Sequence, residues 1–306
     1  MLGAGPAHAF PDKPVRFIIP FAPGGGNDII ARLLGAKLSA TWGQQVVVDN
    51  RPGAGGNLAA ETTARSAPDG HTIFQFNVAN TIAPGLYRKL AYDPVTDFAA
   101  ITQLATSPFI IAVNPSVRAT NVKEFIALAK ANPGKFNYAS SGNGGSTHLL
   151  TEVLKKMAGI EMTHIPYNGA APALTDLLAG QVQMMLAVPF TVMPHIKSGK
   201  VRALGVTSAR RSPLTPDLPT VAESGVKGYE GATWYGVVAP AKTPPAIVTL
   251  LNRDFVRALH EPDVQEKLAA QSVEVVGSTP QAFSQFIRSE IPKWAEAVRI
   301  SGARVD

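Results

Sequence analysis

The sequence predicts an α/β protein of two lobes, and three observations support this fold class. Short apolar runs alternate with amphipathic helical segments along most of the 306 residues, as in parallel βαβ units. Two extended segments, residues 92–113 and 232–240, interrupt the alternation and indicate that the chain crosses between lobes twice. Three glycine-rich turns, residues 24–26, 53–56 and 142–145, each separate an expected strand from an expected helix.

The first lobe begins with the stretch around which the chain is organised, residues 17–28. Its apolar beginning predicts a buried strand, and its prolines and glycines predict a sharp turn. Asn27 or Asp28 then opens a helix, because apolar residues recur at i, i+3, i+4 and i+8: Ile30, Leu33, Leu34 and Leu38. The expected elements that follow are strand 45–50, helix 58–66 and strand 72–78.

The second lobe repeats this alternation. Its expected strands are 109–113, 136–140, 162–167, 182–188 and 201–207, and its expected helices are 122–131, 147–158, 171–178 and 192–198. The chain then rejoins the first lobe through helices 245–260, 262–271 and 280–300, with strand 273–276 between the last two. We therefore assign residues 10–99 plus 233–306 to lobe 1 and residues 100–232 to lobe 2. Two lobes joined by two crossover strands form a clamshell.

The pattern of the N-terminal residues resembles the end of a signal peptide for export. Residues 2–10 are small and uncharged, and Ala7-His8-Ala9 resembles the small-x-small site at which signal peptides are cleaved. We interpret residues 1–9 as a signal-peptide remnant, with Phe10 or Pro11 as the mature start. A natural, unstructured N-terminus is the alternative, since the basic region and full apolar core of a signal peptide are absent.

Composition excludes several functional classes. The chain has no cysteine, which excludes thiol catalysis, disulfides and cysteine-bound metals. The net charge of +6 comes from scattered residues without interleaved aromatics, which argues against nucleic acid binding and favours acidic small molecules. Residues 177–196 are uncharged, but two glutamines and two prolines disfavour a membrane-spanning helix.

The glycine turns are the main candidate for a binding site. A strand, a glycine turn and a helix N-terminus place free backbone N–H groups and partial positive charge at one point, which suits an anion. Turns from both lobes would face a shared cleft, helped by serine and threonine hydroxyls. The candidate residues of these loops are Gly24, Gly25, Gly26, Ser140, Ser141, Asn143, Gly144, Ser146 and Thr147. Loops that merely turn the chain are the alternative.

Other candidate ligand-binding residues lie beside these turns, at strand ends or on a crossing. They are Phe21, Pro23, Asp28, Ala79, Asn80, His148, Tyr167, Asn168, Ala187 and Trp234. Asp28 has two interpretations: it caps its own helix, or it orients donors around a ligand. His148 is equally well explained as a capping or surface histidine. Tyr167 and Trp234 also have a core interpretation, because aromatic residues on strands are usually buried.

Nucleotide and catalytic motifs are absent from the sequence. No glycine loop has the third glycine of the dinucleotide fingerprint or the Lys-Ser/Thr ending of a P-loop. No Gly-x-Ser-x-Gly elbow is present, and no histidine and carboxylate residues have zinc spacing. We therefore expect no metal, no cofactor and no enzyme activity. The rival hypothesis is a two-lobed α/β enzyme, of the transferase type, that acts on an acidic metabolite.

These motifs together resemble the periplasmic solute-binding proteins of tripartite tricarboxylate transport systems, the Bug-type receptors. The matching stretches are residues 19–28, 50–57, 166–169, 172–180 and 218–225. The resemblance implies a type II periplasmic binding protein fold that closes on a small organic anion, with its carboxylate between residues 24–28 and 141–147. It also implies a monomeric periplasmic receptor that delivers its ligand to membrane transporter subunits.

Two positions depart from the family pattern. Many members have Lys where this chain has Asn168, and many have an acidic residue where it has Ala187. Without that acidic residue, the ammonium group of an amino acid would be buried without a partner, which is costly. The sequence therefore predicts a carboxylate that lacks an amino group, either a dicarboxylate or an aromatic acid.

Overall fold

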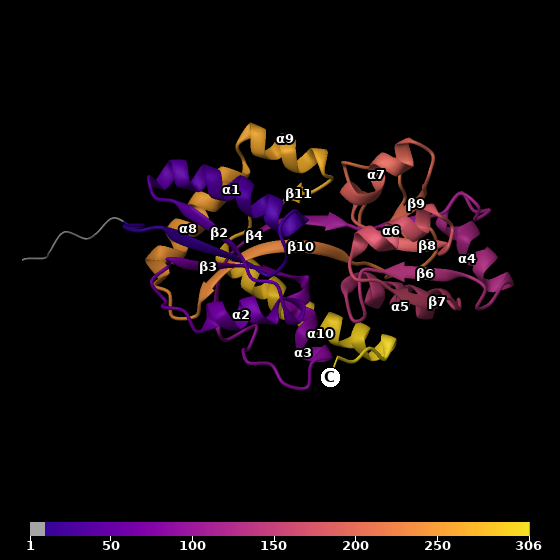
Figure 1. Cartoon of the computed structure of the whole chain (residues 1–306), viewed down its shortest axis with the longest axis horizontal. Coiled ribbons are helices and arrows are strands. Elements are labelled where there is room, and N and C mark those ends of the chain that lie inside the picture. The colour runs from indigo at the N-terminus through magenta and orange to yellow at the C-terminus, as the bar shows by residue number, and fades with distance from the viewer. Residues whose placement is uncertain (1–9, 306) are drawn as a thin grey trace, which may run out of the picture.

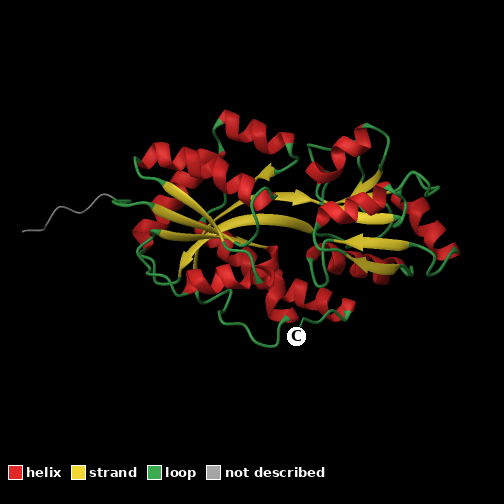
Figure 2. Ribbon diagram, viewed as in Figure 1, coloured by secondary structure: helices red, strands yellow, loops and turns green. Residues whose placement is uncertain are grey.

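A computed structural model describes residues 10–305, and the predicted signal-peptide remnant lies outside these residues. The molecule has two β-sheets flanked by helices, arranged as two lobes along its longest axis (Figure 1). Helices lie on both sides of each sheet (Figure 2). The predicted two-lobed α/β architecture is confirmed.

The first lobe contains a six-stranded sheet in the order β11-β4-β10-β3-β1-β2. Its strands are β1 (Val15–Ile19), β2 (Val46–Asn50), β3 (Thr72–Asn77), β4 (Phe98–Pro108), β10 (Ala232–Pro240) and β11 (Glu274–Val275). β1 is parallel to β2 and β3, whereas β10 is antiparallel to β3 and β4. The carboxyl ends of β1 and β3 therefore meet at one edge of the sheet, where ligands bind in open α/β sheets.

The second lobe contains a five-stranded sheet in the order β7-β6-β8-β5-β9. Its strands are β5 (Ile110–Val113), β6 (Asn137–Ser140), β7 (Thr163–Pro166), β8 (Met184–Ala187) and β9 (Arg202–Val206). β6 is parallel to β7 and β8, and β5 is antiparallel to β8 and β9. The same arrangement of a strand followed by a helix thus occurs in both lobes.

The helices bury their apolar faces against these sheets. The first lobe has α1 (Gly26–Trp42), the short helix η1 (Ala54–Gly56), α2 (Asn57–Ala64), α3 (Val78–Leu86), α8 (Pro245–Leu259), α9 (Pro262–Ala270) and α10 (Pro280–Ser301). The second has α4 (Val122–Ala131), α5 (Ser146–Ala158), α6 (Ala170–Leu178) and α7 (Pro189–Lys197). Within residues 10–305, no helix is both long and apolar enough to span a membrane.

The boundary between the sheets differs from the predicted one. We expected lobe 2 to begin at residue 100, but β4 pairs with β10 along its length and belongs to the first sheet. The sheet changes between Pro108 and Ile110. The apolar run of β4 gave no indication of its partner, because that partner lies far along the chain. The return crossing at Ala232 agrees with the first residue of β10.

Helix α3 was not predicted. The sequence suggested a strand that ends at residue 78, and Pro84 and Gly85 masked the helical pattern that follows. Asn77 caps α3, since its side chain accepts a hydrogen bond from the Ala79 N–H, and the Asn80 side chain accepts one from the Asn77 N–H. This reciprocal capping box turns the chain sharply from β3 into α3.

The hydrophobic core continues from one lobe into the other. One cluster of buried side chains includes Phe74 and Trp234 of the first sheet and Tyr138 and Leu186 of the second. Trp234 lies near the start of β10, where the chain returns to the first lobe. The two lobes are therefore packed together around the crossover strands.

Candidate functional site

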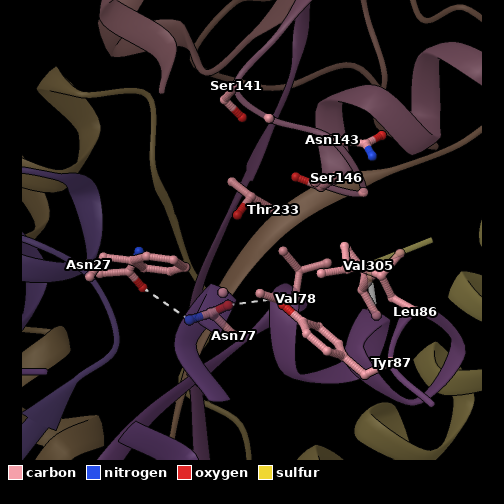
Figure 3. Close-up of a pocket in the computed structure, with 17 residues that line it drawn as sticks. Asn27, Asn77, Val78, Leu86, Tyr87, Ser141, Asn143, Ser146, Thr233 and Val305 are labelled. Atoms are coloured by element: carbon pink, nitrogen blue, oxygen red, sulfur yellow. Dashed lines mark hydrogen bonds between the residues drawn. The ribbon is translucent and has the colours of Figure 1, made fainter. Parts of the chain in front are cut away.

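A cavity of roughly 330 Å³ lies between the two lobes (Figure 3). Its lining comes from the ends of β1 and β3, the start of α3, the loop between β6 and α5, and β10. The lining residues are Phe21, Asn27, Gly55, Asn77, Val78, Ala79, Ile82, Leu86, Tyr87, Ser141, Gly142, Asn143, Gly144, Gly145, Ser146, Thr233 and Val305. The volume is at the lower end of the range for small-molecule sites, about 300–1,000 Å³.

The glycine loop of the first lobe is held by Asp28. Its buried carboxylate accepts hydrogen bonds from the Gly24 N–H, the Asn50 side-chain amide and the Arg32 guanidinium, each at 3.0 Å. Burial alone would raise the pKa of Asp28, but these hydrogen bonds outweigh it and hold the pKa below its usual value. Asp28 therefore stays ionised and braces the loop.

The structure contradicts the first sequence interpretation of Asp28, that it caps its own helix. The N-cap of α1 is Gly25, which makes no side-chain capping bond, and Asp28 is the third residue of the helix, in its first turn. The expectation that Asp28 is the N-cap is therefore wrong. Its carboxylate reaches back to the loop instead, so it shapes the backbone in front of α1.

The glycine loop of the second lobe is held by neutral groups. The Gly144 N–H donates to His148 Nδ1 at 3.0 Å, and the Ser141 N–H donates to Thr147 Oγ1 at 3.2 Å. The Gly142 N–H donates to Ser140 Oγ at 3.3 Å. These three backbone donors are used within the loop and are not free for a ligand.

A stack of rings lies behind the second loop. The His148 and His164 rings are parallel with their centroids 3.9 Å apart, and His164 stacks on Tyr138 at 4.9 Å. Burial, and then the neighbouring His164, lower the pKa of His148 to about 4. His148 is therefore neutral near pH 7, as its acceptance of the Gly144 N–H at Nδ1 requires.

Three helix N-termini point their partial positive charge at the cavity. Asn27 belongs to the first turn of α1, Val78 and Ala79 to that of α3, and Ser146 to that of α5, and all four line the cavity. The first N–H groups of a helix have no intrahelical partner, and the dipole favours a negative charge there. No residue that lines the cavity carries a charged side chain. The arrangement can hold an anion with peptide dipoles and amide or hydroxyl groups.

The structure brings some of the predicted site residues together at the cavity. Those that line it are Phe21, Ala79, Ser141, Asn143, Gly144 and Ser146. Those that do not are Pro23, Gly24, Gly25, Gly26, Asp28, Asn80, Ser140, Thr147, His148, Tyr167, Asn168, Ala187 and Trp234. Several of the second group brace the loops that the first group occupies, as described above for Asp28, Thr147 and His148.

Other predicted residues have different partners. Asn80 is fully buried. Its side-chain amide donates to the Tyr92 hydroxyl, and its side-chain oxygen accepts the hydrogen bond from the Asn77 N–H in the capping box. The Tyr167 hydroxyl donates to Asp176, which keeps that ring beside α6. Asn168 is exposed, and Ala187 is buried at the end of β8. None of these four residues lines the cavity.

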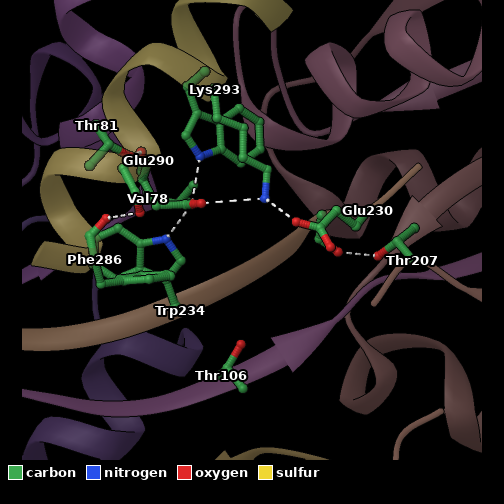
Figure 4. Close-up of polar contacts among 12 residues, drawn as sticks. Val78, Thr81, Thr106, Thr207, Glu230, Trp234, Phe286, Glu290 and Lys293 are labelled. Atoms are coloured by element: carbon green, nitrogen blue, oxygen red, sulfur yellow. Dashed lines mark hydrogen bonds and ion pairs between the residues drawn. The ribbon is translucent and has the colours of Figure 1, made fainter. Parts of the chain in front are cut away.

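Trp234 belongs to a polar cluster behind the crossover strand (Figure 4). Its indole N–H donates to Glu290 at 3.0 Å, and the Trp294 indole donates to the same carboxylate oxygen at 2.9 Å. Lys293 lies 3.3 Å from both Glu290 and Glu230. This cluster ties α10 to the segment that enters β10, so the core interpretation of Trp234 holds.

Several lining residues are not among the individual candidates named from the sequence. Asn27 and Gly142 fall within the ranges 24–28 and 141–147 that the family resemblance implied, and Asn77 directly precedes the missed helix α3. The positions of these three residues, beside glycine turns or at a strand end, could have identified them as site residues. No sequence pattern identifies Tyr87 or Val305 in this way. A parallel β-bridge brings Val305 beside Tyr87 from the far end of the chain. Across residues 10–305, no group of three or more His, Cys, Asp or Glu residues is arranged to hold a metal ion.

Similarity to known proteins agrees with this geometry. Residues 30–302 match the model of the tripartite tricarboxylate transporter family receptor. Protein BugT of Bordetella pertussis is 38% identical over 98% of this chain and 92% of its own length.

Solved structures share the whole fold. R. palustris Rpa4515 with adipate has a TM-score of 0.86 and 37% identity, covering 97% of this chain and 100% of that one. Periplasmic binding protein BugD has a TM-score of 0.83 and 36% identity, covering 97% and 100%. MatC from Rhodopseudomonas palustris with bound malate has a TM-score of 0.82 and 33% identity, covering 94% and 100%. The chain therefore belongs to the tripartite tricarboxylate transporter receptor family, whose Bug-type members it resembled in sequence.

Proposed function

We propose that this protein captures a small organic carboxylate between its lobes in the periplasm and delivers it to a tripartite tricarboxylate-type membrane transporter. The observation that carries the proposal is the uncharged cavity on which three helix N-termini converge. Related proteins of known structure hold adipate and malate, which are carboxylates. Export as a monomer and transient contact with transporter subunits are part of this proposal.

The enzyme hypothesis is not supported. The family and the solved relatives are solute-binding proteins rather than enzymes. The two groups that an enzyme could have used, Asp28 and His148, are both engaged in holding loops. Neither lines the cavity, so neither is placed to exchange a proton with a ligand there.

The ligand that fits this cavity lacks an amino group. An ammonium group buried between the lobes needs a carboxylate partner, and no acidic side chain lines the cavity. Asp28 could have replaced the missing acidic residue, but its carboxylate already binds Gly24, Arg32 and Asn50. A dicarboxylate or an aromatic acid therefore remains the proposed class.

Ligand binding is expected to favour the closed arrangement of the lobes, because both lobes line the same cavity. In the structure, the position that a Gly144 Cβ would occupy is 2.7 Å from a Leu86 methyl carbon, so the second loop already touches α3. Small-angle scattering with and without ligand measures this closure. An unchanged radius of gyration at saturation would argue against it.

Native mass spectrometry of freshly purified protein tests the function directly, since a carried-over ligand adds its own mass. Thermal shift on matched pairs, succinate with aspartate and glutarate with glutamate, tests the absence of an amino group. Ligand stabilisation grows with the ratio of ligand concentration to Kd, so the pairs can be compared at equal concentration. We expect the diacids to stabilise more than the amino acids. Greater stabilisation by the amino acids would contradict the proposal for this ligand class.

A further inference from the structure

The two lobes meet at two places beside the cavity, and we propose that Phe190 and Leu86 hold them closed around a bound carboxylate. We call these two side chains the latches. Each is an apolar side chain of one lobe that lies against a glycine turn of the other lobe. The inference rests on the proposed function and names residues that control how tightly the ligand is held.

The first latch is Leu86, on α3 of the first lobe. Its two methyl carbons lie 2.7 and 2.9 Å from the position that a Gly144 Cβ would occupy, so Leu86 covers this residue of the second lobe closely. Gly144 is buried, although it belongs to a loop. Separation of the lobes would return both apolar surfaces to water, so the contact favours the closed arrangement.

The second latch is Phe190, in the first turn of α7 in the second lobe. Its ring edge lies 3.7 Å from the position of a Gly26 Cβ, at the start of α1 in the first lobe. The same position is 2.8 Å from the Tyr235 hydroxyl, so α1 has no room for a side chain there. In Figure 1, α1 and α7 lie above β10, and α3 and α5 lie below it. The two latches therefore flank this crossover strand.

Phe190 is not needed to attach α7 to its own lobe. Val192 is fully buried, and Met193 and Ile196 pack against the core cluster of the second sheet. Phe190 is half-buried, but across residues 10–305 it belongs neither to a core cluster nor to the side chains packed against one. A large apolar side chain in this position gains its burial at the other lobe, as a latch requires.

Closure and affinity are linked, and this link distinguishes a latch from a residue that touches the ligand. The measured affinity is that of the closed form, reduced by the fraction of the protein that is closed. A residue that stabilises only the closed form therefore changes the affinity for every ligand by the same factor. Phe190 does not line the cavity, so its effect on the ligand comes through closure alone.

Isothermal titration calorimetry on the full chain, with succinate, glutarate, adipate and benzoate, tests Phe190→Ala. We expect each acid that binds the natural protein to bind this variant about fivefold more weakly, with factors that agree within about twofold. Phe190→Leu keeps an apolar side chain at the contact and should recover most of the affinity. Unchanged affinity in Phe190→Ala, or factors that differ widely from acid to acid, would overturn the latch role of Phe190.

Phe136→Ala is the matched control, because it truncates a half-buried phenylalanine inside the second lobe. The Phe136 ring packs edge-on against Phe125, with the ring centroids 6.0 Å apart. We expect Phe136→Ala to lower the midpoint of denaturant unfolding and leave the affinities unchanged. Phe190→Ala should do the reverse in the same two measurements. Equal loss of affinity in both variants would indicate general damage to the second lobe and would contradict the latch.

Leu86 differs from Phe190 because it also lines the cavity. Leu86→Ala removes a latch and a ligand contact together, so it should weaken the binding of every acid, by factors that differ from one acid to another. Circular dichroism reports whether the variant folds. Unchanged affinities in a folded Leu86→Ala protein would remove Leu86 from the pair of latches.

The outcomes separate this inference from the proposed function. A natural protein that binds none of the acids and carries none in native mass spectrometry would overturn the proposed function, and the latches with it. A natural protein that binds an acid, with Phe190→Ala binding it equally well, would overturn the latch alone and leave the proposed function intact.

Discussion

The two glycine loops that face the cavity have the same backbone plan but different supports. Each follows a parallel strand and precedes a helix whose N-cap is a glycine, Gly25 in one lobe and Gly145 in the other. The first loop is braced by the ionised carboxylate of Asp28. The second is braced by the neutral imidazole of His148 and by side-chain hydroxyls.

This difference shows that a glycine turn specifies the path of the chain and not the chemistry that holds it. An ionised brace keeps its hydrogen bonds down to low pH, whereas an imidazole acceptor loses its lone pair when it is protonated. The two loops should therefore respond differently to substitution and to pH, although both lie beside one ligand cavity. Four predictions test that contrast, from the largest expected effect to the smallest.

The largest effect is expected at Gly144 compared with Gly25. Gly144 has a φ of +71°, and a Cβ there would lie 2.7 Å from a Leu86 methyl carbon, whereas Gly25 has a φ of −83° and no atom within 4 Å. Gly144→Val should lower the free energy of unfolding by about 4 kcal/mol through backbone strain and overpacking. Gly25→Val should cost about 1 kcal/mol, as the loss of a glycine N-cap. Denaturant unfolding measures both, and equal costs would contradict the contrast.

The second effect is a fall in stability with acid that comes from His148. The unfolded chain protonates this residue near its ordinary pKa of 6.5, but the folded protein does so only near the lowered pKa of about 4. The unfolded state therefore binds more protons as the pH falls from about 6.5 to 4, and the loss reaches about 3 kcal/mol. The pKa of His164 is also lowered, chiefly by burial, so it adds to this trend.

Chemical denaturation at a series of pH values measures this slope. His148→Asn should flatten it, because that variant has no imidazole to protonate. The first loop supplies the internal contrast: the pKa of Asp28 is lowered from 3.8, so its contribution is present above pH 4 and is lost only in stronger acid. An identical slope in His148→Asn would show that other groups cause the acid sensitivity.

A third effect compares the loss of one brace in each loop. Asp28→Asn replaces one of the two acceptor oxygens by an NH2 donor, so either the Gly24 N–H or the Asn50 amide loses its acceptor, and the free energy of unfolding should fall by about 2 kcal/mol. Thr147→Val keeps the shape of the side chain but removes the acceptor of the Ser141 N–H, and should cost about 1 kcal/mol. A smaller loss for Asp28→Asn than for Thr147→Val, at low and high salt, would reverse the ranking of the two braces.

The smallest effect is expected at a hydroxyl that lines the cavity. Ser141→Ala removes an oxygen whose protein contact is Thr147 Oγ1 at 3.2 Å, while the backbone of the loop stays in place. Binding should weaken by about 1 kcal/mol, roughly fivefold, because helix N-termini supply most of the donors. Calorimetry with the carried-over ligand measures it. A loss of several hundredfold would make this hydroxyl, and not the helix dipoles, the main anion donor.

The sequence predicted the fold well where local patterns decide it. Periodic apolar residues and glycine turns located the strands and helices of both lobes, with α3 as the exception because Pro84 and Gly85 interrupt its pattern. The assignment of β4 to a sheet was wrong because pairing depends on β10, which is distant in sequence. Local propensity carries no information about such a partner.

The site was predicted less completely than the fold. Residues of the second glycine loop line the cavity, whereas Gly24, Gly25 and Gly26 of the first loop do not, and the direction of the side chains was not accessible from spacing. His148 and Thr147 turn inward and use up loop N–H groups, so they support the site without lining it. Val305 lies at the cavity because it pairs with Tyr87, and no sequence motif predicts this tertiary contact.

The strand order of the larger sheet determines when each lobe can be completed during synthesis. The five-stranded sheet uses strands from one continuous stretch of chain, from Ile110 to Val206. The six-stranded sheet places β10 between β3 and β4, so its centre stays vacant until residues 232–240 have been made. The lobe whose chain starts first therefore finishes last. Until then β3 and β4 both keep an unpaired edge, which exposes backbone N–H and C=O groups to pairing with another chain.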